Sequence, residues 1–227
     1  MRTMIVTGTG TGVGKTVVTA AVAALAAAAG QRVVVVKPAQ TGIAPGEPGD
    51  LADVERLTGG RVGTLELARY PEPLAPATAA RRSGLEPLHI VTVEQALRDV
   101  QADLVLVEGA GGLLVRLNDE AETLADLDLP VLLVASAGLG VLNTAALTAE
   151  ALRSRGRELV GTVVGAYPEQ PDLAERTNLG DLPVVTGAPL LGVLPAGLGD
   201  ADPAALERAA RCGLHPLLGG QWIEPES

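Results

Sequence analysis

The sequence predicts an α/β fold in which helices cover both faces of a doubly wound, mainly parallel sheet. Short β-branched runs alternate with Ala- and Leu-rich segments along the 227 residues, a pattern typical of right-handed crossovers between parallel strands. Most of the runs are continuously apolar, as in strands buried on both faces. With 47% hydrophobic but only 1% aromatic residues, the core must consist of Val, Leu and Ala. Residues 1–220 are expected to form one domain, followed by a partly disordered tail, 221–227.

The predicted elements follow one another in a simple order. Strands are expected at Met4–Thr7, Arg32–Lys37, Leu104–Glu108, Val131–Ala135, Leu159–Gly165 and Leu190–Leu194. Helices are expected at Lys15–Ala29, Asp50–Leu57, Val93–Gln101, Asn143–Arg155 and Pro203–Arg211, and the Pro- and Gly-rich segments 43–49 and 71–76 are expected to be loops. Because ligands of such sheets bind beyond the carboxyl ends of the strands, the segments that directly follow the strands are the candidate site.

Charge and composition exclude several classes of protein. A net charge of -10 argues against nucleic acid or an anionic membrane as partner, since both require a basic face. The single cysteine, Cys212, excludes a disulfide framework, and with His89 and His215 it forms no zinc-type cluster. The longest nearly apolar stretch, Val17–Ala29, is too short to span a bilayer. The chain starts directly with a strand instead of a signal peptide, so a cytoplasmic protein is expected.

Residues 5–16, IVTGTGTGVGKT, place four glycines between an apolar strand and a helix. The usual phosphate loop is Gly-x4-Gly-Lys-Thr, but here Thr9 stands at the position of the first glycine and Gly8 lies one residue earlier. The glycines still allow backbone N–H groups to surround an anion at the positive end of the helix. Lys15 is expected to reach the β- and γ-phosphates of a nucleotide, and the Thr16 hydroxyl to ligate Mg²⁺. The alternative is a tight turn with a chance Lys-Thr pair.

A second lysine, Lys37, directly follows four valines, and Pro38 is expected to end that strand. Taken alone, Lys37 is equally well explained as a lysine whose ammonium extends into solvent at the end of a strand. Beside a phosphate loop, it suits a site that holds a further negative charge next to the γ-phosphate. Thr41 follows within reach as a hydroxyl donor.

Two carboxylates are candidate magnesium ligands. Glu108 ends the apolar run LVLVE, which is the position of a Walker-B-type ligand, although it could also cap a loop. Asp50 is either the N-cap of a helix or a second carboxylate on the metal, while Asp53 is expected to be solvated. The Gly-rich segment Ser136–Asn143 is either a structural loop or a helix start that holds an anion.

Taken together, these motifs resemble those of the dethiobiotin synthetase family. The matching stretches are VTGTGTGVGKT, KPAQTG, GDLADV, LVEGAGGLLV, LGVLNTAALTAEAL and PLLGVLP, in the family's order over residues 5 to about 197. The enlarged phosphate loop is itself a family feature, whereas KPxxTG and VEGAGG occur in looser form in related P-loop amidoligases. The resemblance implies a P-loop NTPase fold and a homodimer that takes small-molecule substrates, with no nucleic acid or membrane partner.

The implied reaction uses 7,8-diaminononanoate, CO2, Mg²⁺ and a nucleoside triphosphate, ATP in the family. One amine becomes a carbamate, whose oxygen attacks the γ-phosphate to give a carbamic-phosphoric anhydride. The second amine then closes the ureido ring and expels phosphate. Lysines, a helix start and Mg²⁺ suit the negative charges that gather in such a site.

Carried over motif by motif, the resemblance assigns four groups of residues. The catalytic residues are Lys15 and Lys37, and the Mg²⁺ ligands are Thr16, Asp50 and Glu108. The nucleotide-binding residues are Gly12, Val13, Gly14, Lys15, Thr16, Val17, Glu108, Gly109, Ala110, Gly111, Gly165, Ala166, Pro195, Ala196 and Gly197. The substrate-binding residues are Thr11, Thr41, Ala110, Gly111, Gly140, Leu142 and Asn143, of which the last three would face the substrate carboxylate across the dimer.

The chain departs from the family at one point. Many members carry an Asn-Asp pair after the sixth strand, and its Asn recognises adenine, but here the residues are Gly165-Ala166-Tyr167. Either backbone groups near Gly165 and Pro195–Gly197 recognise the base, or the selectivity is relaxed and CTP serves as well.

Three other classes of protein share parts of this pattern. Partitioning or positioning ATPases carry an extra lysine early in the loop, where this chain has only Thr and Gly. Corrin-type amidoligases add a glutaminase domain, for which the chain has no room. A binding module that has lost catalysis remains an alternative, although the full set of Lys15, Thr16, Lys37 and Glu108 argues against it.

Overall fold

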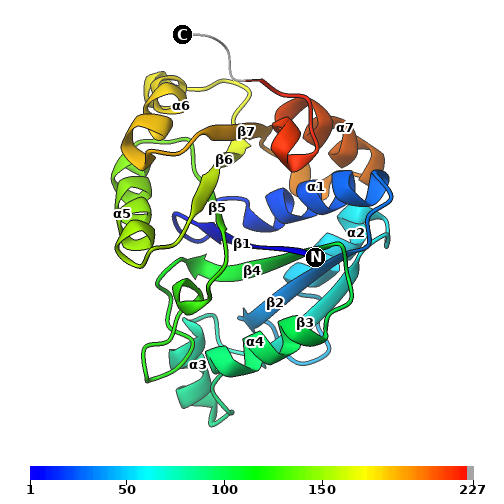
Figure 1. The fold of residues 1–227 in the computed structure, drawn as a ribbon, viewed down its shortest axis with the longest axis vertical. Coiled ribbons are helices and arrows are strands. Elements are labelled where there is room, and N and C mark those ends of the chain that lie inside the picture. Colours follow the sequence, from blue (N-terminus) through cyan, green and yellow to red (C-terminus); the bar gives the residue numbers. More distant parts are fainter. Residues whose placement is uncertain (224–227) are drawn as a thin grey trace.

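The computed structural model describes residues 1–223. Its strands are β1 (Arg2–Gly8), β2 (Val33–Thr41), β3 (Gly63–Tyr70), β4 (Leu104–Gly112), β5 (Val131–Ala135), β6 (Leu159–Tyr167) and β7 (Leu190–Pro195). The helices are α1 (Lys15–Ala28), α2 (Asp50–Thr58), α3 (Pro76–Ser83), α4 (Ile90–Asp99), α5 (Val141–Ser154), α6 (Leu173–Thr186) and α7 (Pro203–Gly213), with 3-10 turns η1 (Leu124–Asp126), η2 (Leu198–Asp200) and η3 (Pro216–Leu218). All seven strands form one sheet in the order β3-β2-β4-β1-β5-β6-β7 (Figure 1). Each neighbouring pair is parallel, which confirms the predicted doubly wound α/β fold.

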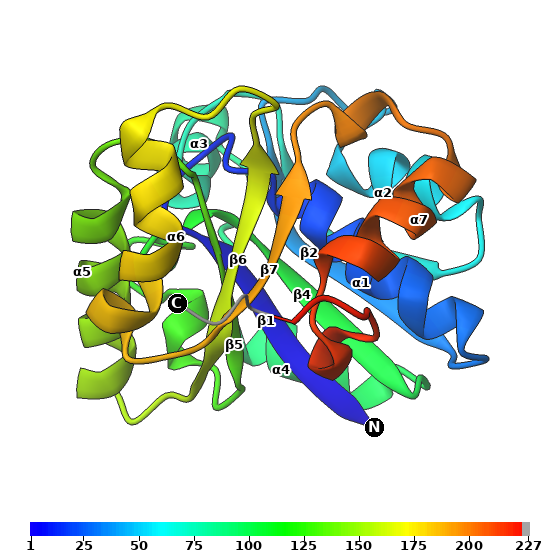
Figure 2. The ribbon, with the colours of Figure 1, turned by 90° about the horizontal axis from the view of Figure 1, so that it is seen from above.

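Helices cover both faces of the sheet (Figure 2). α1, α2 and α7 lie on one face, and α3, α4, α5 and α6 lie on the other. The neighbours Ile5 and Val6 in β1 are both fully buried but belong to different core clusters, one on each face. This alternation explains why the strands are continuously apolar, because both sets of side chains must be buried.

Three elements were not predicted from the sequence. β3 is an edge strand whose residues are mostly half-buried, so its sequence, GTLELARY, mixes polar and apolar side chains and lacks the continuous apolar run of a central strand. α6 contains Pro183, which breaks the helical pattern, although the capping box formed by Asp172 and Glu175 marks its start. α3 begins at Pro76, the last residue of the predicted loop, and is followed by Gly84. No element was predicted for the rest of this helix.

Two strands extend four residues past their predicted ends, and the first is β4, which ends at Gly112 instead of Glu108. β2 continues through Pro38 to Thr41 instead of ending at Lys37. Its ladder with β4 stops at the pair Val36–Val107, so from Lys37 onward β2 pairs with β3 only. A proline that lacks the N–H donor is tolerated where a strand has a neighbour on one side.

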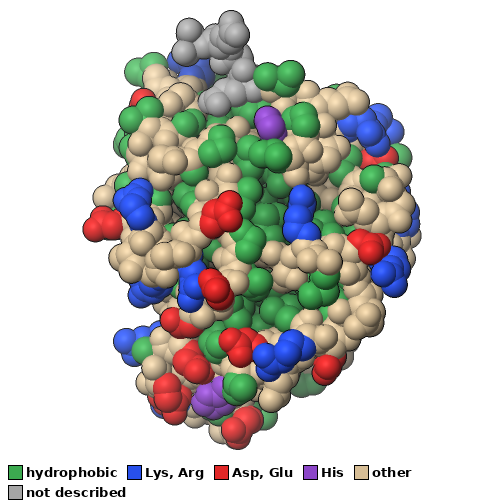
Figure 3. Space-filling view, in the orientation of Figure 1, with side chains coloured by type: hydrophobic (Ala, Val, Ile, Leu, Met, Phe, Trp, Pro, Cys, Tyr) green, Lys and Arg blue, Asp and Glu red, His purple; other side chains and the backbone are tan. Residues whose placement is uncertain are grey.

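The surface carries both hydrophobic and charged side chains. Figure 3 shows hydrophobic side chains over the middle of one face, with acidic and basic side chains interspersed around them. None of the helices within residues 1–223 is long and apolar enough to cross a membrane.

The predicted tail, residues 221–227, is described as far as Ile223. The amides of Gln221 and Trp222 attach it to the fold, since they donate to the carbonyls of Arg211 and Leu214 at 2.7 and 2.9 Å. Residues 224–227 lie outside the described residues.

β6 lies directly against the phosphate loop. A Cβ added at Gly165 would lie 2.3 Å from the Val13 carbonyl oxygen and 3.2 Å from the Gly14 Cα. A Cβ on Gly14 would lie 2.7 Å from the Gly165 carbonyl oxygen. Two glycines therefore let the backbones of the loop and the strand touch, and no side chain fits at position 165 without moving the loop.

We expect Gly165→Ala to lower the free energy of unfolding by about 1–3 kcal/mol, because the added methyl overlaps rigid backbone atoms. Urea unfolding measures this change. The matched control is Gly180→Ala in α6, where a Cβ meets nothing within 4 Å and the unfolding free energy should stay equal or rise by less than about 1 kcal/mol. Equal stability of the two variants would contradict the close contact between β6 and the loop.

Candidate active site

The phosphate loop joins the carboxyl end of β1 to α1. Gly14 caps α1 in the left-handed conformation, with φ of 90°, and within residues 1–223 no side chain caps this helix. The first backbone N–H groups of α1 therefore remain available to an anion. Lys15 is buried and folds back over the loop, where its Nζ donates to the Gly10 carbonyl at 2.9 Å. The loop has the donors and the cation that a phosphate group needs.

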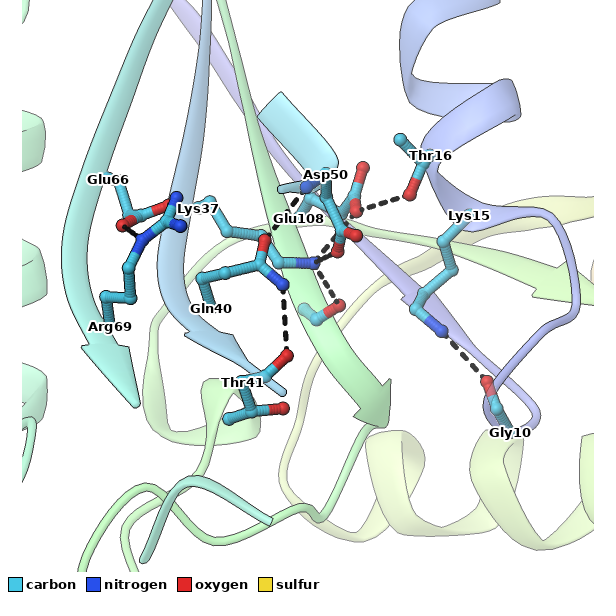
Figure 4. A network of polar contacts seen from close by, with 11 residues as sticks. Gly10, Lys15, Thr16, Lys37, Gln40, Thr41, Asp50, Glu66, Arg69 and Glu108 are labelled. Carbon is cyan, nitrogen blue, oxygen red and sulfur yellow. Dashed lines mark hydrogen bonds and ion pairs between the residues drawn. The ribbon is translucent and has the colours of Figure 1, made fainter. Parts of the chain in front are cut away.

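Lys37 forms the centre of a buried ionic cluster (Figure 4). Its Nζ donates to Glu108 Oε1 at 2.9 Å and forms an ion pair with the Asp50 carboxylate. The side chains of Lys37 and Glu108 are only 3% and 1% exposed. The ammonium of Lys37 therefore does not extend into solvent at the strand end. The Lys37 Nζ also lies 3.4 Å from the Gly109 carbonyl oxygen.

The two carboxylates hold this cluster without acting as helix or loop caps. Glu108 Oε1 accepts a hydrogen bond from Thr16 Oγ1 at 3.0 Å, which ties β4 to the first turn of α1. Asp50 is the first residue of α2. The N-cap of this helix is Gly49, and no side chain at that position bonds the first backbone amides. Asp53 lies further along the helix, is 59% exposed and pairs with Arg56. The solvated position predicted for Asp53 is confirmed.

Burial and neighbouring charges shift the pKa values of the two lysines in opposite directions. Burial favours a neutral amine at Lys37, but the attraction of Glu108 and Asp50 outweighs it and raises the pKa of Lys37 above its ordinary value. Burial lowers the pKa of Lys15, and the nearby positive charge of Lys37 lowers it further. Lys37 is already neutralised by carboxylates, whereas Lys15 lacks a close anionic partner among the described residues. An anionic ligand beside Lys15 would supply one.

The donor set fits a magnesium ion that is completed by phosphate or water oxygens. Glu108 Oε2 is buried and has no hydrogen-bond partner within residues 1–223, a costly state for a carboxylate oxygen unless a ligand satisfies it. Hydroxyl and carboxylate oxygens from Thr16, Asp50 and Glu108 are the hard ligands that Mg²⁺ prefers. The described residues contain no group of three or more His, Cys, Asp or Glu arranged around a metal, so an all-protein cage is not what this site offers.

A cavity of about 790 Å³ opens above this cluster. Its lining brings together half of the residues predicted for the site: Thr11, Gly12, Gly14, Lys15, Thr16, Val17, Lys37, Thr41, Asp50, Ala110 and Gly111. Glu108 and Gly109 lie beneath it, bonded to Lys37. A space of this size is within the range of small-molecule sites and lies at the carboxyl edge of the sheet, where such folds bind ligands.

The other predicted residues lie outside this cavity. Val13 is buried beneath the loop, and Gly165 touches the back of Gly14. Pro195 ends β7 at the same edge, and the amide of the next residue, Ala196, donates to the Tyr167 carbonyl at 2.8 Å. Residues 140–143 begin α5, directly after Leu139, which is 92% exposed. These last residues line no part of the cavity in their own chain.

Sequence reasoning missed one wall of the cavity. Pro73, Leu74, Ala75 and Pro76 line it, and they follow the carboxyl end of β3. Because β3 was not predicted, the segment after it was never placed at the ligand edge. Gln40 also lines the cavity, and its contacts depend on the position of α2, which no local pattern indicates.

Known proteins resemble this chain over nearly its whole length. The family model described as an AAA domain matches residues 2–198. ATP-dependent dethiobiotin synthetase BioD of Saccharopolyspora erythraea is 63% identical, covering 98% of this chain and 99% of the relative. The protein of the same name from Corynebacterium efficiens is 47% identical, covering 96% of this chain and 100% of the relative.

Solved structures agree on the fold. The MinC:MinD cell division protein complex of Aquifex aeolicus matches with a TM-score of 0.58 at 15% identity, covering 100% of this chain and 99% of that one. The cell division ATPase MinD of Pyrococcus furiosus matches with a TM-score of 0.55 at 20% identity, covering 100% and 93%. Identities this low support a shared fold alone. The dethiobiotin synthetases, in contrast, match at high identity from end to end, and the chain belongs to the ATP-dependent dethiobiotin synthetase family.

Proposed function

We propose that this chain is an ATP-dependent ligase that converts 7,8-diaminononanoate and CO2 into dethiobiotin. The observation that carries the proposal is the meeting of Lys15, Lys37, Asp50 and Glu108 at one cavity beside the phosphate loop. Membership of the dethiobiotin synthetase family supports the substrates, and the arrangement of charges supports the chemistry. A switch ATPase would need the loop but not the second, buried lysine.

The reaction balances in three steps. One amine adds to CO2 and loses a proton, which gives a carbamate. A carbamate oxygen attacks the γ-phosphorus, the bond to the β–γ bridging oxygen breaks, and ADP leaves. The second amine attacks the carbonyl carbon of the carbamic-phosphoric anhydride, the C–O bond breaks, phosphate leaves with the electron pair, and the amine proton is released. Since the carbamate is already an anion, the phosphoryl step needs no general base.

The chain's own groups bind and orient the reacting anions. The first amides of α1 and the ammonium of Lys15 hold phosphate oxygens at the bottom of the cavity. Lys37, whose pKa is raised, stays protonated and stabilises the carbamate beside the γ-phosphate. Mg²⁺, held by Thr16, Asp50 and Glu108, would supply charge neutralisation for the transferring phosphoryl group. Thr11, Thr41 and the Ala110–Gly111 backbone are left to contact the diamine.

We expect Lys37→Ala to lower the turnover by about 100-fold or more, because a preorganised charge at the reacting anion is lost. Mass detection of dethiobiotin, formed from diaminononanoate, bicarbonate, Mg²⁺ and ATP, measures turnover, and calorimetry should show that ATP still binds. Arg98→Ala, at an exposed position of α4, is the control and should keep full activity. Unchanged turnover in Lys37→Ala would remove Lys37 from the mechanism. Wild-type protein that hydrolyses ATP without diaminononanoate and forms no product would overturn the proposed function.

The nucleotide base is recognised without an amide side chain at position 165, where no side chain fits. We therefore expect relaxed base selectivity, with CTP supporting a turnover within about tenfold of that with ATP, or 1.4 kcal/mol. A comparison of ATP, CTP, GTP and UTP under the same assay tests this expectation. Strict dependence on ATP would contradict it. Gly165→Asn should displace the loop and weaken all four nucleotides instead of restoring adenine selectivity.

The site is proposed to be completed by a second copy of the chain. The support is Leu139, a large hydrophobic residue that is 92% exposed directly before the start of α5. The family resemblance assigns the start of this helix, at Gly140, Leu142 and Asn143, to the substrate bound by the partner. We expect Leu139→Asp to raise the dimer dissociation constant about tenfold or more in sedimentation velocity. Val91→Asp, which changes a residue 52% exposed on α4, should leave the dimer intact. A wild-type protein that sediments as a monomer would contradict the dimer.

A further inference from the structure

We infer that Gln40 is a positioning residue that holds Asp50 against Lys37 and Glu108, and that position 49 is glycine to leave room for Gln40. The inference rests on the proposed magnesium site, and it concerns two residues to which the family resemblance assigns no role. The contact between Gln40 and the Asp50 backbone positions one of the two carboxylates.

Gln40 joins β2 to the start of α2. Its side chain is buried, with the residue 4% exposed. Oε1 accepts a hydrogen bond from the Asp50 backbone amide at 2.9 Å, and Nε2 donates to the Thr41 carbonyl at 3.2 Å (Figure 4). Both ends of the amide group are therefore engaged, so the side chain has one orientation.

This contact replaces a missing helix cap. The first N–H groups of a helix have no partner within the helix, and a side chain at the N-cap position usually satisfies one of them. The N-cap of α2 is Gly49, which has no side chain. Gln40 supplies the acceptor from another element, and it fixes the backbone of the residue that carries the carboxylate.

One strand carries both residues that bind Asp50. Lys37 and Gln40 both belong to β2, so the lysine that binds the Asp50 carboxylate and the amide that binds its backbone move together. The Asp50 side chain itself is 38% exposed, and packing alone does not restrain it. Without the Gln40 contact, only the ion pair with Lys37 would hold the carboxylate in position relative to Glu108.

Arg69 holds the middle of the loop that connects β2 to α2. Its Nη1 donates to the carbonyls of Ala44 and Glu47 at 3.1 and 2.7 Å, and Glu66 binds the guanidinium at 2.6 and 2.8 Å. Arg69 therefore fixes the middle of the loop to β3. Gln40 fixes the residue at its end, which is the residue that enters the site.

Gly49 has no backbone reason to be glycine. Its φ of -112° and ψ of -165° are extended values that any residue adopts. A Cβ at this position would lie 2.7 Å from Gln40 Oε1 and 2.9 Å from Gln40 Cδ. The space around Gly49 is therefore filled by the end of the Gln40 side chain, and a methyl group there would push that end away from the Asp50 amide.

Residues that orient a metal ligand influence affinity almost as strongly as the ligands do. Loss of such a contact typically weakens metal binding by about 10- to 100-fold. We expect Gln40→Ala to raise the Mn²⁺ dissociation constant about tenfold, measured by electron paramagnetic resonance with a saturating non-hydrolysable ATP analogue. Gly49→Ala should have a similar effect. In kinetics, both should raise the KM for metal more than they change kcat.

The two positions provide a built-in control. With Gln40 reduced to alanine, the methyl of Gly49→Ala no longer meets a side-chain end, so the double variant should match Gln40→Ala alone. Gln40→Glu keeps an oxygen acceptor for the Asp50 amide but loses the donor to the Thr41 carbonyl, so it should bind Mn²⁺ more tightly than Gln40→Ala. Additive losses in the double variant would contradict the shared mechanism.

A second readout uses the lysines. The sequence contains only Lys15 and Lys37, so protein labelled with ¹⁵N-lysine has two side-chain ammonium signals. Gln40→Ala should shift the Lys37 signal, because the Asp50 carboxylate moves, and should leave the Lys15 signal in place. A purely structural role of Gln40 would lower the unfolding temperature without changing the Lys37 signal or the Mn²⁺ affinity.

Asp50→Asn separates this inference from the proposed function. If Asp50→Asn binds Mn²⁺ as tightly as the wild type, the assignment of Asp50 to the metal is wrong. If Asp50→Asn weakens Mn²⁺ binding but Gln40→Ala and Gly49→Ala do not, the metal site stands and the role of Gln40 is overturned. Should Gln40→Ala fail to fold, Gly49→Ala carries the test alone, since its methyl meets only the flexible end of a side chain.

Discussion

The buried ion pair between Lys37 and Glu108 is the interaction on which the site depends. Taking two charges out of water costs several kcal/mol for each ion, and this cost is offset only where the partner is held in good geometry. The two residues are 71 positions apart in the sequence, so only the fold can bring them together. β2 and β4 do so by register: the ladder pairs Val36 with Val107, and the next residue of each strand carries a charge.

The charges at this edge are balanced, which explains how a hydrophobic sheet can end in four ionisable groups. Lys15 and Lys37 are matched by Asp50 and Glu108. Lys15 and Lys37 are also the chain's only lysines, so the cationic side chains elsewhere are arginines. A lysine carries a compact charge on a flexible stem, so it can follow a phosphoryl group or a carbamate, whereas the planar fork of arginine is better suited to the fixed pairs seen on Glu66 and Glu72.

The parts of this structure that the sequence predicts are those set by local pattern. Continuous apolar runs located the central strands, and the charged residues that end two of them, Lys37 and Glu108, meet because parallel strands end at one edge. β3 was missed because an edge strand is half-buried and need not be apolar. That single omission hid the cavity wall from Pro73 to Pro76. Gln40 could not be identified at all, since its partner is the first turn of α2 and nothing near it in the sequence marks the contact.

The missed wall also explains how one cavity can take two chemically different ligands. Its base holds Lys15, which has no close anionic partner among the described residues, and the backbone donors of the phosphate loop, which match a triphosphate and a carbamate. The wall formed by Pro73, Leu74, Ala75 and Val115 is apolar, which matches the hydrocarbon chain of a diamine acid. Thr11, in the lengthened part of the phosphate loop, is exposed and lines the same cavity. The hydroxyl of Thr11 is therefore available on the cavity surface to either of the proposed ligands.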